Sequence, residues 1–188
     1  FRTQGRGCIV NITSVGGKVS VPHLVPYSCA KFAAVAFSEG LAAELSGTGI
    51  RVVTIAPGLM RTGSYVNALF KGNRRGEAAW FSASASLPGI SMSAKRAAQQ
   101  IVGAVRSGRN ERILSLSANW LARFHGLFPE VSLAMLSGVN RLLPSGSESA
   151  PHQVETGAES EILERPWMRA ITALGRRAAE EYLQPATR

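Results

Sequence analysis

Short β-branched runs and longer stretches of helical periodicity follow one another along the first part of the chain. Residues 8–12 (CIVNI) form an apolar run bounded by glycines, which suits a short buried strand of a parallel sheet. Residues 28–45 contain few helix breakers and are rich in alanine and leucine, so they predict a helix. A second helix is expected over residues 93–107 and a last strand over residues 112–116. Together these elements predict an α/β fold.

A different pattern begins after residue 117. Residues 118–143 are apolar at helical spacing with interruptions at Gly126 and Pro129, which predicts two short helices. Such a stretch could line a substrate pocket, pack across a subunit interface or lie on a membrane surface. We favour packing, because apolar faces of surface helices usually bury into their own core.

The C-terminal segment changes composition abruptly. Residues 144–161 are dominated by Pro, Ser, Gly and Glu, which is typical of a disordered linker. An apolar stripe from Trp167 to Tyr182 then predicts an amphipathic helix. The expected organisation is a folded part over 1–143, a flexible linker over 144–165 and a terminal helix over 166–188.

Three side chains are candidates for proton-transfer chemistry. Ser14 follows the predicted strand at its C-terminal end, where ligands bind in open α/β sheets. Tyr27 and Lys31 lie four residues apart near the first turn of the predicted helix, so their side chains share one face. A phenol ionises only at about pH 10, and a neighbouring ammonium favours its ionised form. The three residues therefore predict acid–base chemistry on a carbonyl or an alcohol.

Each pattern alone has an ordinary alternative, since Tyr-x-x-x-Lys occurs by chance and a serine after a strand is usually a turn or cap residue. Their order along the chain is more specific. Residues 7–14 (GCIVNITS) end in Ser14, Tyr27 follows thirteen residues later, and residues 50–58 (IRVVTIAPG) come after the helix. In these elements the sequence resembles the classical branch of the short-chain dehydrogenase/reductase family, with its fifth strand, its Tyr-x-x-x-Lys helix and its sixth strand with a Pro-Gly turn.

The resemblance implies a role for each of the three candidate residues. Tyr27 would be the general acid/base, and Ser14 would orient and polarise the carbonyl. Lys31 would favour the ionised tyrosine and hydrogen-bond the nicotinamide ribose, so that Tyr27 and Lys31 both contact the cofactor. The cofactor implied is NAD(P)H, which carries the hydride.

Further cofactor contacts are implied at the Pro-Gly turn. Pro57, Gly58 and Leu59 would face the nicotinamide carboxamide with their backbone groups. Thr62 would offer its hydroxyl to the carboxamide or the pyrophosphate. A helix cap is an equally good explanation for this threonine.

The family's glycine-rich phosphate turn has no counterpart in the chain. No G-x-G-x-x-G spacing stands between a strand and a helix, and Gly16-Gly17 follows the wrong strand. The choice between NAD and NADP is therefore open.

We expect the last strands and helices of a Rossmann-like doubly wound parallel sheet without its N-terminal dinucleotide-binding half. Such a fragment would be inactive alone, and the competing interpretation is a non-catalytic remnant that acts only through subunit association.

The variable segment after the Pro-Gly turn gives a coarse indication of substrate. Residues 63–92 carry aromatic side chains among small and polar ones, and in the family this segment is a substrate loop that could close over the nicotinamide. This implies a small-molecule carbonyl or alcohol of apolar character. The basic cluster Lys71, Arg74 and Arg75 is a candidate contact for an acidic cofactor, with a mobile loop as the alternative.

Composition excludes several other functions. The chain has no aspartate and its three histidines are far apart, which excludes a Ser-His-Asp triad and argues against a metal site. The net charge is +9, but the basic residues are dispersed, so no nucleic-acid partner is expected.

No apolar run approaches the ~18 residues of a membrane span. Cys8 and Cys29 show no metal or CxxC spacing, which fits a cytoplasmic protein, and the resemblance implies a homo-oligomer when intact.

Overall fold

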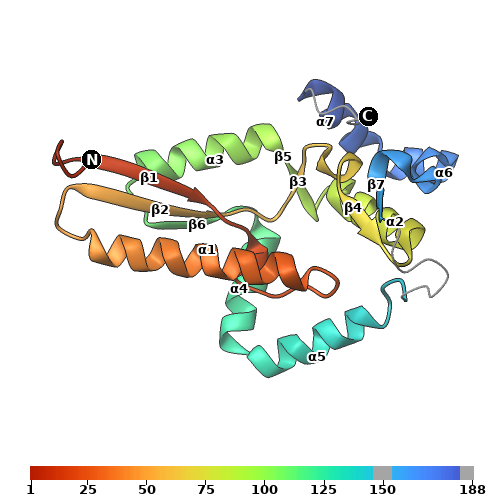
Figure 1. Ribbon diagram of the computed structural model, residues 1–188, viewed down its shortest axis with the longest axis horizontal. Coiled ribbons are helices and arrows are strands. Elements are labelled where there is room, and N and C mark those ends of the chain that lie inside the picture. The colour runs from red at the N-terminus through yellow and green to blue at the C-terminus, as the bar shows by residue number, and fades with distance from the viewer. Residues whose placement is uncertain (146–153, 183–188) are drawn as a thin grey trace. The chain divides into compact units, whose positions relative to one another are not determined.

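The computed structural model describes residues 1–145 and 154–182. Residue contacts divide the chain into two compact units. Unit 1 comprises Phe1–Gly58 and Lys95–Leu136, and unit 2 comprises Leu59–Ala94 and Ser137–Arg188. Each unit is described by itself, and the elements of both are labelled in Figure 1.

A three-stranded parallel sheet forms the centre of unit 1. Its strands are β1 (Gly7–Ile12), β2 (Ile50–Ala56) and β6 (Glu111–Ile113). Their order is β1-β2-β6, so β2 is central, and six of its seven residues are buried. A central strand of a parallel sheet is covered on both faces, which explains the continuous apolar run in its sequence. The predicted α/β fold with a parallel sheet is confirmed.

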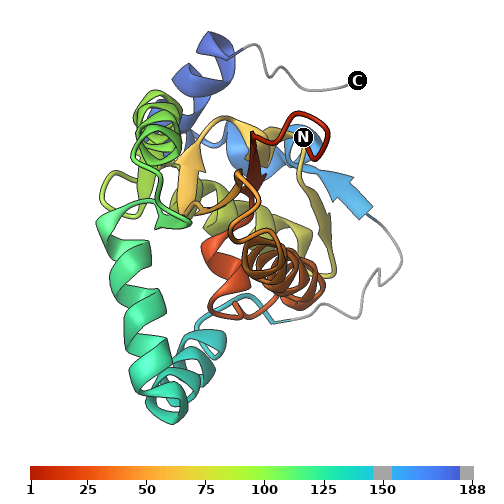
Figure 2. The ribbon, with the colours of Figure 1, turned by 90° about the vertical axis from the view of Figure 1, so that its left-hand side faces the viewer.

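The helices of unit 1 follow the predicted pattern. α1 begins with Pro26 in its first turn, where a missing backbone N–H costs nothing, and continues through an alanine-rich stretch. α1 and α3 lie on opposite sides of the sheet (Figure 1, Figure 2). The two short helices expected after residue 117 are present and are separated at Phe128. The helices are α1 (Val25–Glu44), α3 (Ala94–Arg106), α4 (Leu116–Leu127) and α5 (Pro129–Asn140), the last of which continues into unit 2.

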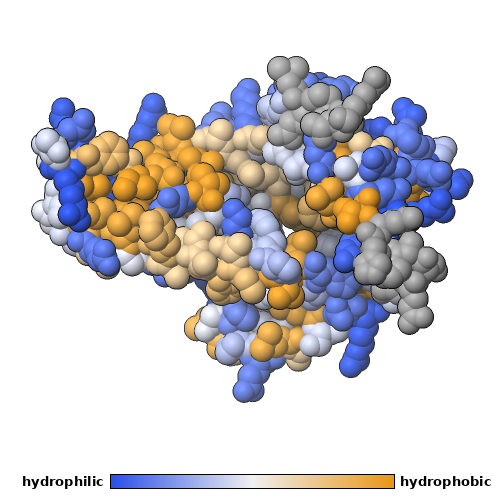
Figure 3. Space-filling view, in the orientation of Figure 1, coloured by the Kyte–Doolittle hydropathy of each residue, from blue (hydrophilic) through white to orange (hydrophobic). Residues whose placement is uncertain are grey.

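One surface of unit 1 is apolar. Within the described part of the chain β1 pairs only with β2, and its Val10 and Ile12 are 36% and 49% exposed. Phe32 and Phe37 of α1 are exposed as well. Figure 3 shows hydrophobic surface gathered over β1, β2 and α1. Exposed strand edges and apolar patches of this kind are where proteins associate.

Unit 2 combines two small sheets with short helices. β3 (Leu59–Arg61) pairs in parallel with β5 (Ser91–Ser93), and β4 (Leu69–Lys71) pairs antiparallel with β7 (Val154–Thr156). Its α-helices are α2 (Arg74–Ser86), α6 (Pro166–Ile171) and α7 (Ala173–Glu181), and a single-turn 3-10 helix, η2, covers Ser64–Val66.

The core of unit 2 joins segments that are distant in sequence. Tyr65, Ala85, Leu163 and Met168 are buried together. These residues come from η2, α2, the segment before α6, and α6 itself. The C-terminal segment is therefore an integral part of this unit.

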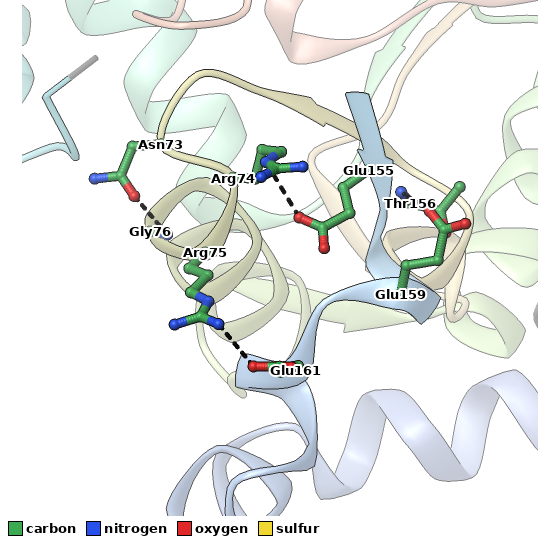
Figure 4. A network of polar contacts seen from close by, with 8 residues as sticks. All are labelled: Asn73, Arg74, Arg75, Gly76, Glu155, Thr156, Glu159 and Glu161. Carbon is green, nitrogen blue, oxygen red and sulfur yellow. Dashed lines mark hydrogen bonds and ion pairs between the residues drawn. The ribbon is translucent and has the colours of Figure 1, made fainter. Parts of the chain in front are cut away.

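Ion pairs tie α2 to the C-terminal segment, as Figure 4 shows. Arg74 Nε lies 3.4 Å from a carboxylate oxygen of Glu155, and Arg75 Nη2 lies 2.7 Å from one of Glu161. Two residues of the basic cluster are thus paired with glutamates of their own unit. Glu159 accepts hydrogen bonds from the backbone N–H and the hydroxyl of Thr156, and these bonds lower the pKa of its carboxyl.

Some segments differ from the sequence-based expectation. Residues 63–92 contain the thirteen-residue helix α2 rather than a continuous loop, because Asn73 caps a stretch of alanine and other small residues. The expected linker contains β7, while its residues 146–153 lie outside the described part of the chain. The expected terminal helix is divided into α6 and α7 at Thr172, whose hydroxyl donates to the carbonyl of Met168.

Candidate active site

Ser14 is positioned by backbone hydrogen bonds that flank it on both sides. The N–H of Thr13 donates to the Ile55 carbonyl at 2.7 Å, and the N–H of Val15 donates to the Pro57 carbonyl at 2.8 Å. β1 is thereby held to β2 beyond its last residue. Ser14 is 9% exposed and its Oγ accepts a hydrogen bond from the Gly16 N–H at 3.0 Å. Its own hydroxyl proton is therefore available to another acceptor.

Gly16 and Gly17 bring this segment against α1. A Cβ on Gly16 would lie 3.1 Å from Cε1 of Tyr27 and 3.4 Å from Oγ of Ser14. A Cβ on Gly17 would collide with the backbone carbonyl of Lys31. From the sequence these glycines were expected to bound a strand and not to form a phosphate turn. Their spacing after Ser14 is a signal of close backbone approach that could have been used.

Tyr27 and Lys31 share the first two turns of α1, as their spacing predicts. The Tyr27 side chain is 45% exposed, and the Nζ of Lys31 lies 5.6 Å from the centroid of its ring. At this distance a cation is attracted by the ring face. The three predicted residues Ser14, Tyr27 and Lys31 are therefore neighbours around Gly16 and Gly17.

The two lysines near this site differ in their partners. Lys18 Nζ contacts Glu39 at 2.6 Å and Glu111 at 2.9 Å. Burial lowers the pKa of Lys18, but the hydrogen bonds and charges of both glutamates outweigh burial and raise the pKa overall. Lys31, in contrast, makes no ion pair with any residue that the structure describes. Its ammonium has donors left for a ligand.

The Pro-Gly turn begins beside Ser14. The Pro57 carbonyl is occupied by the Val15 N–H. A Cβ on Gly58 would lie 3.1 Å from Oγ of Ser115 and 3.2 Å from Cβ of Ala118, so a larger residue at this position would press on the start of α4. These contacts fix where the chain leaves unit 1.

The remaining two predicted residues belong to unit 2. Leu59 begins β3, and Thr62 follows that strand. The Thr62 Oγ1 accepts a hydrogen bond from the Ser64 N–H at 3.4 Å. This is a local turn contact, since Gly63 and not Thr62 is the N-cap of η2. A cofactor contact of Leu59 or Thr62 remains a prediction.

Other kinds of site find no support among residues 1–145 and 154–182. No group of three or more His, Cys, Asp or Glu there could hold a metal ion. No helix within these ranges is long and apolar enough to cross a membrane. Cys8 and Cys29 are both free thiols.

Comparison with known proteins assigns the first part of the chain. The family model described as short chain dehydrogenase matches residues 1–69, which include Ser14, Tyr27 and Lys31. This part of the chain is similar to the short-chain dehydrogenase family. The predicted resemblance is confirmed.

Individual relatives of the short-chain dehydrogenase family match at moderate identity. The dehydrogenase/reductase SDR family protein 7-like of Anopheles gambiae is 44% identical over 68 residues, or 36% of this chain and 21% of that protein. The crystal structure of a short-chain dehydrogenase from Streptomyces avermitilis has 27% identity and a TM-score of 0.54, covering 74% of this chain and 54% of that one.

A further solved structure shares the fold. A short chain dehydrogenase from Burkholderia cenocepacia, in complex with NADP, has 22% identity and a TM-score of 0.53, covering 72% of this chain and 48% of that one. The chain thus spans about half the length of these solved structures and about a fifth of the Anopheles relative.

Proposed function

We propose that Ser14, Tyr27 and Lys31 form the proton-transfer site of an NAD(P)-dependent oxidoreductase that interconverts a carbonyl and an alcohol. The observation that carries the proposal is the close approach at Gly16. The Tyr27 ring and the Ser14 hydroxyl both border the point that a Cβ of Gly16 would occupy. This proximity supports a site in which one substrate oxygen is bound by both side chains, and the match of residues 1–69 to the short-chain dehydrogenase family model supports the same chemistry.

Each side chain has a distinct task in the proposed reaction. Ser14 donates its free hydroxyl proton in a hydrogen bond to the carbonyl oxygen and polarises it. Tyr27 transfers its phenolic proton to that oxygen as negative charge develops there. The Lys31 ammonium beside the ring stabilises the tyrosinate that remains.

The residues present fit a nicotinamide cofactor. Lys31 offers ammonium protons without a described acidic partner, and Tyr27 is exposed beside it, so both would hold the ribose. Backbone groups of Gly58 and Leu59 and the hydroxyl of Thr62 would complete the contacts. When bound, NAD(P)H supplies the hydride. NADH and NADPH both remain candidates because the residues that choose between them are not among those matched.

The chain by itself is proposed to be inactive. Its 188 residues contain no glycine-rich phosphate turn between a strand and a helix, and helix N-termini preceded by such turns hold dinucleotide phosphates. The substrate class is proposed to be apolar small-molecule carbonyls or alcohols, on the strength of the aromatic residues in 63–92.

The test joins this chain to the N-terminal portion of a relative. A chimera joins the N-terminal portion of the Streptomyces avermitilis dehydrogenase to this chain at Gly7, and nicotinamide oxidation is followed with a panel of apolar ketones. We expect turnover in the chimera and a loss of about 100-fold or more with Tyr27→Phe, while nicotinamide fluorescence still reports cofactor binding. Unchanged turnover in Tyr27→Phe would reject the assignment of Tyr27.

A second candidate function is association without catalysis. The exposed Phe32 and Phe37 of α1 favour it, because large apolar side chains on a helix surface suit a subunit contact. A chimera that binds NADPH but reduces none of the ketones, together with a self-associating 188-residue chain, would favour this function. Homo-oligomerisation and cytoplasmic localisation both remain predictions.

A further inference from the structure

A chain of polar side chains, buried except at its half-buried end Asn11, connects three elements of unit 1. The Nδ2 of Asn11 on β1 donates to Oγ of Ser38 on α1 at 2.9 Å. Ser38 Oγ lies 2.7 Å from Oγ1 of Thr54 on β2. Ser38 is 0% and Thr54 2% exposed. Because Ser38 accepts the amide proton, its own hydroxyl proton is free for Thr54.

This network supplies what apolar packing on α1 does not. Dispersion and burial are non-directional, and besides Leu41, which packs against Ile50 and Val52, α1 buries only small side chains such as Val35. A helix packed only in this way has weak preference for its position along its axis. Hydrogen bonds require short distances and correct angles. A shift of α1 along its axis by less than the rise of one residue, about 1.5 Å, would therefore already break the hydrogen bonds of Ser38.

The network and the candidate site lie on the same two elements. Asn11 is three residues before Ser14 on the β1 segment, and Ser38 is seven residues after Lys31 on α1. Residues seven apart share a helix face, so Lys31 and Ser38 are two turns apart on one side of α1. α1 is thus fixed at two points: at Gly16 and Gly17 near its start, and at Ser38.

We propose that Asn11, Ser38 and Thr54 are positioning residues, which set the register of α1 along the sheet and thereby hold Tyr27 beside Ser14. The proposal rests on the proposed function for its catalytic meaning. The contact that it concerns, between the Tyr27 ring and Gly16, is measurable without any activity.

The experiment is NMR on the full 188-residue chain with labelled tyrosine and glycine. In the unsubstituted protein we expect a nuclear Overhauser effect between the ring protons of Tyr27 and the Hα protons of Gly16. Ser38→Ala is expected to reduce its intensity by half or more. Ser82→Ala is the matched control, since Ser82 is also a fully buried helical serine, lies in unit 2 and has no hydrogen-bond partner. It should leave the effect unchanged.

Two further variants separate positioning from stability. Val53→Ala removes buried apolar volume from β2 without touching a polar group, so it lowers the unfolding midpoint but should keep the Tyr27–Gly16 effect. If Ser38→Ala does not fold, Asn11→Ala opens the network from its half-buried end.

The outcomes are distinct. The proposal would be overturned if Ser38→Ala and Asn11→Ala lower the unfolding midpoint but leave the nuclear Overhauser effect between Tyr27 and Gly16 unchanged. The network would then only stabilise the fold. A reduced effect in these variants and an unchanged one in Val53→Ala would support the proposal. In the chimera, Ser38→Ala should lower kcat with little change in cofactor binding. Retained turnover in Tyr27→Phe would reject the proposed function and leave the NMR result standing.

Discussion

The two units of the chain are stabilised by contacts of different kinds. In unit 1, β1 and α1 meet through backbone approach at Gly17 and through the buried Asn11–Ser38–Thr54 network. In unit 2, α2 is tied to a segment 86 residues away by the exposed Arg75–Glu161 pair. Short contacts without solvent tolerate little displacement, whereas exposed ion pairs are weak and adaptable. Ser14, Tyr27 and Lys31 lie in unit 1, next to the close approach at Gly17.

The largest effect is expected from Gly17→Ala. Its Cβ would collide with the Lys31 carbonyl, which is backbone and cannot rotate away, so β1 or α1 must shift. We expect a loss of about 3 kcal/mol in the free energy of unfolding of unit 1. Hydrogen exchange of β2 amides would report this loss, because it follows unit 1 separately.

A second glycine provides the matched control. Gly40 is inside α1, and a Cβ there would meet no atom within 4 Å. Gly40→Ala should therefore stabilise unit 1 by about 0.5–1 kcal/mol through helix propensity. Equal effects of the two substitutions would contradict the close approach at Gly17.

The same two units show how far the sequence could predict the structure. The strand at 8–12 and the long helix were predictable because a β-branched apolar run and an alanine-rich stretch without helix breakers are local signals. The three candidate residues followed from their spacing together with the family resemblance. Contacts between residues that are distant in sequence could not be predicted. Ser38 is one more small polar residue in an alanine-rich helix, and only the tertiary structure places Asn11 and Thr54 beside it.

The segment 63–92 shows the complementary limit. The family resemblance implied a loop here, but helix α2 forms because Asn73 caps it and because it packs against segments that follow residue 153. Tertiary contacts commonly override weak local preference, and a glutamate such as Glu161 cannot be assigned its arginine partner from sequence alone.

A smaller effect is expected at Gly175, where α7 meets α2. A Cβ there would collide with Oγ of Ser86 and lie 2.9 Å from Cε1 of Tyr65. Both neighbours are side chains that can adjust, so Gly175→Ala should destabilise unit 2 by about 1–2 kcal/mol. Adding Ser86→Ala removes the colliding oxygen, which has no hydrogen-bond partner to lose, and should recover part of the loss. The stability of both variants would be measured by hydrogen exchange of α2. A double variant that is no more stable than Gly175→Ala alone would contradict this contact.

Lys18 tests whether unit 1 also depends on charge. Its raised pKa means that the ion pairs with Glu39 and Glu111 stabilise the folded state fully below the unfolded pKa of 10.5 and lose that contribution as pH rises through the higher folded pKa. Lys18→Met should cost about 1 kcal/mol at pH 7 and should remove this alkaline component. Parallel stability profiles of both proteins above pH 10 would contradict the raised pKa.

The smallest effect is expected for the exposed pair of unit 2, and it tests whether exposure sets the strength of such contacts. Arg75 and Glu161 are 69% and 74% exposed, whereas Arg74 and Glu155 are 27% and 26% exposed. Water and salt screen the first pair more, so Arg75→Met should change the stability of unit 2 by less than about 0.5 kcal/mol, and Arg74→Met by up to about 1 kcal/mol. Hydrogen exchange of α2 at low and high salt would measure both. A larger loss for Arg75→Met would mean that the shorter contact distance, rather than burial, determines how strongly α2 is held to the C-terminal segment.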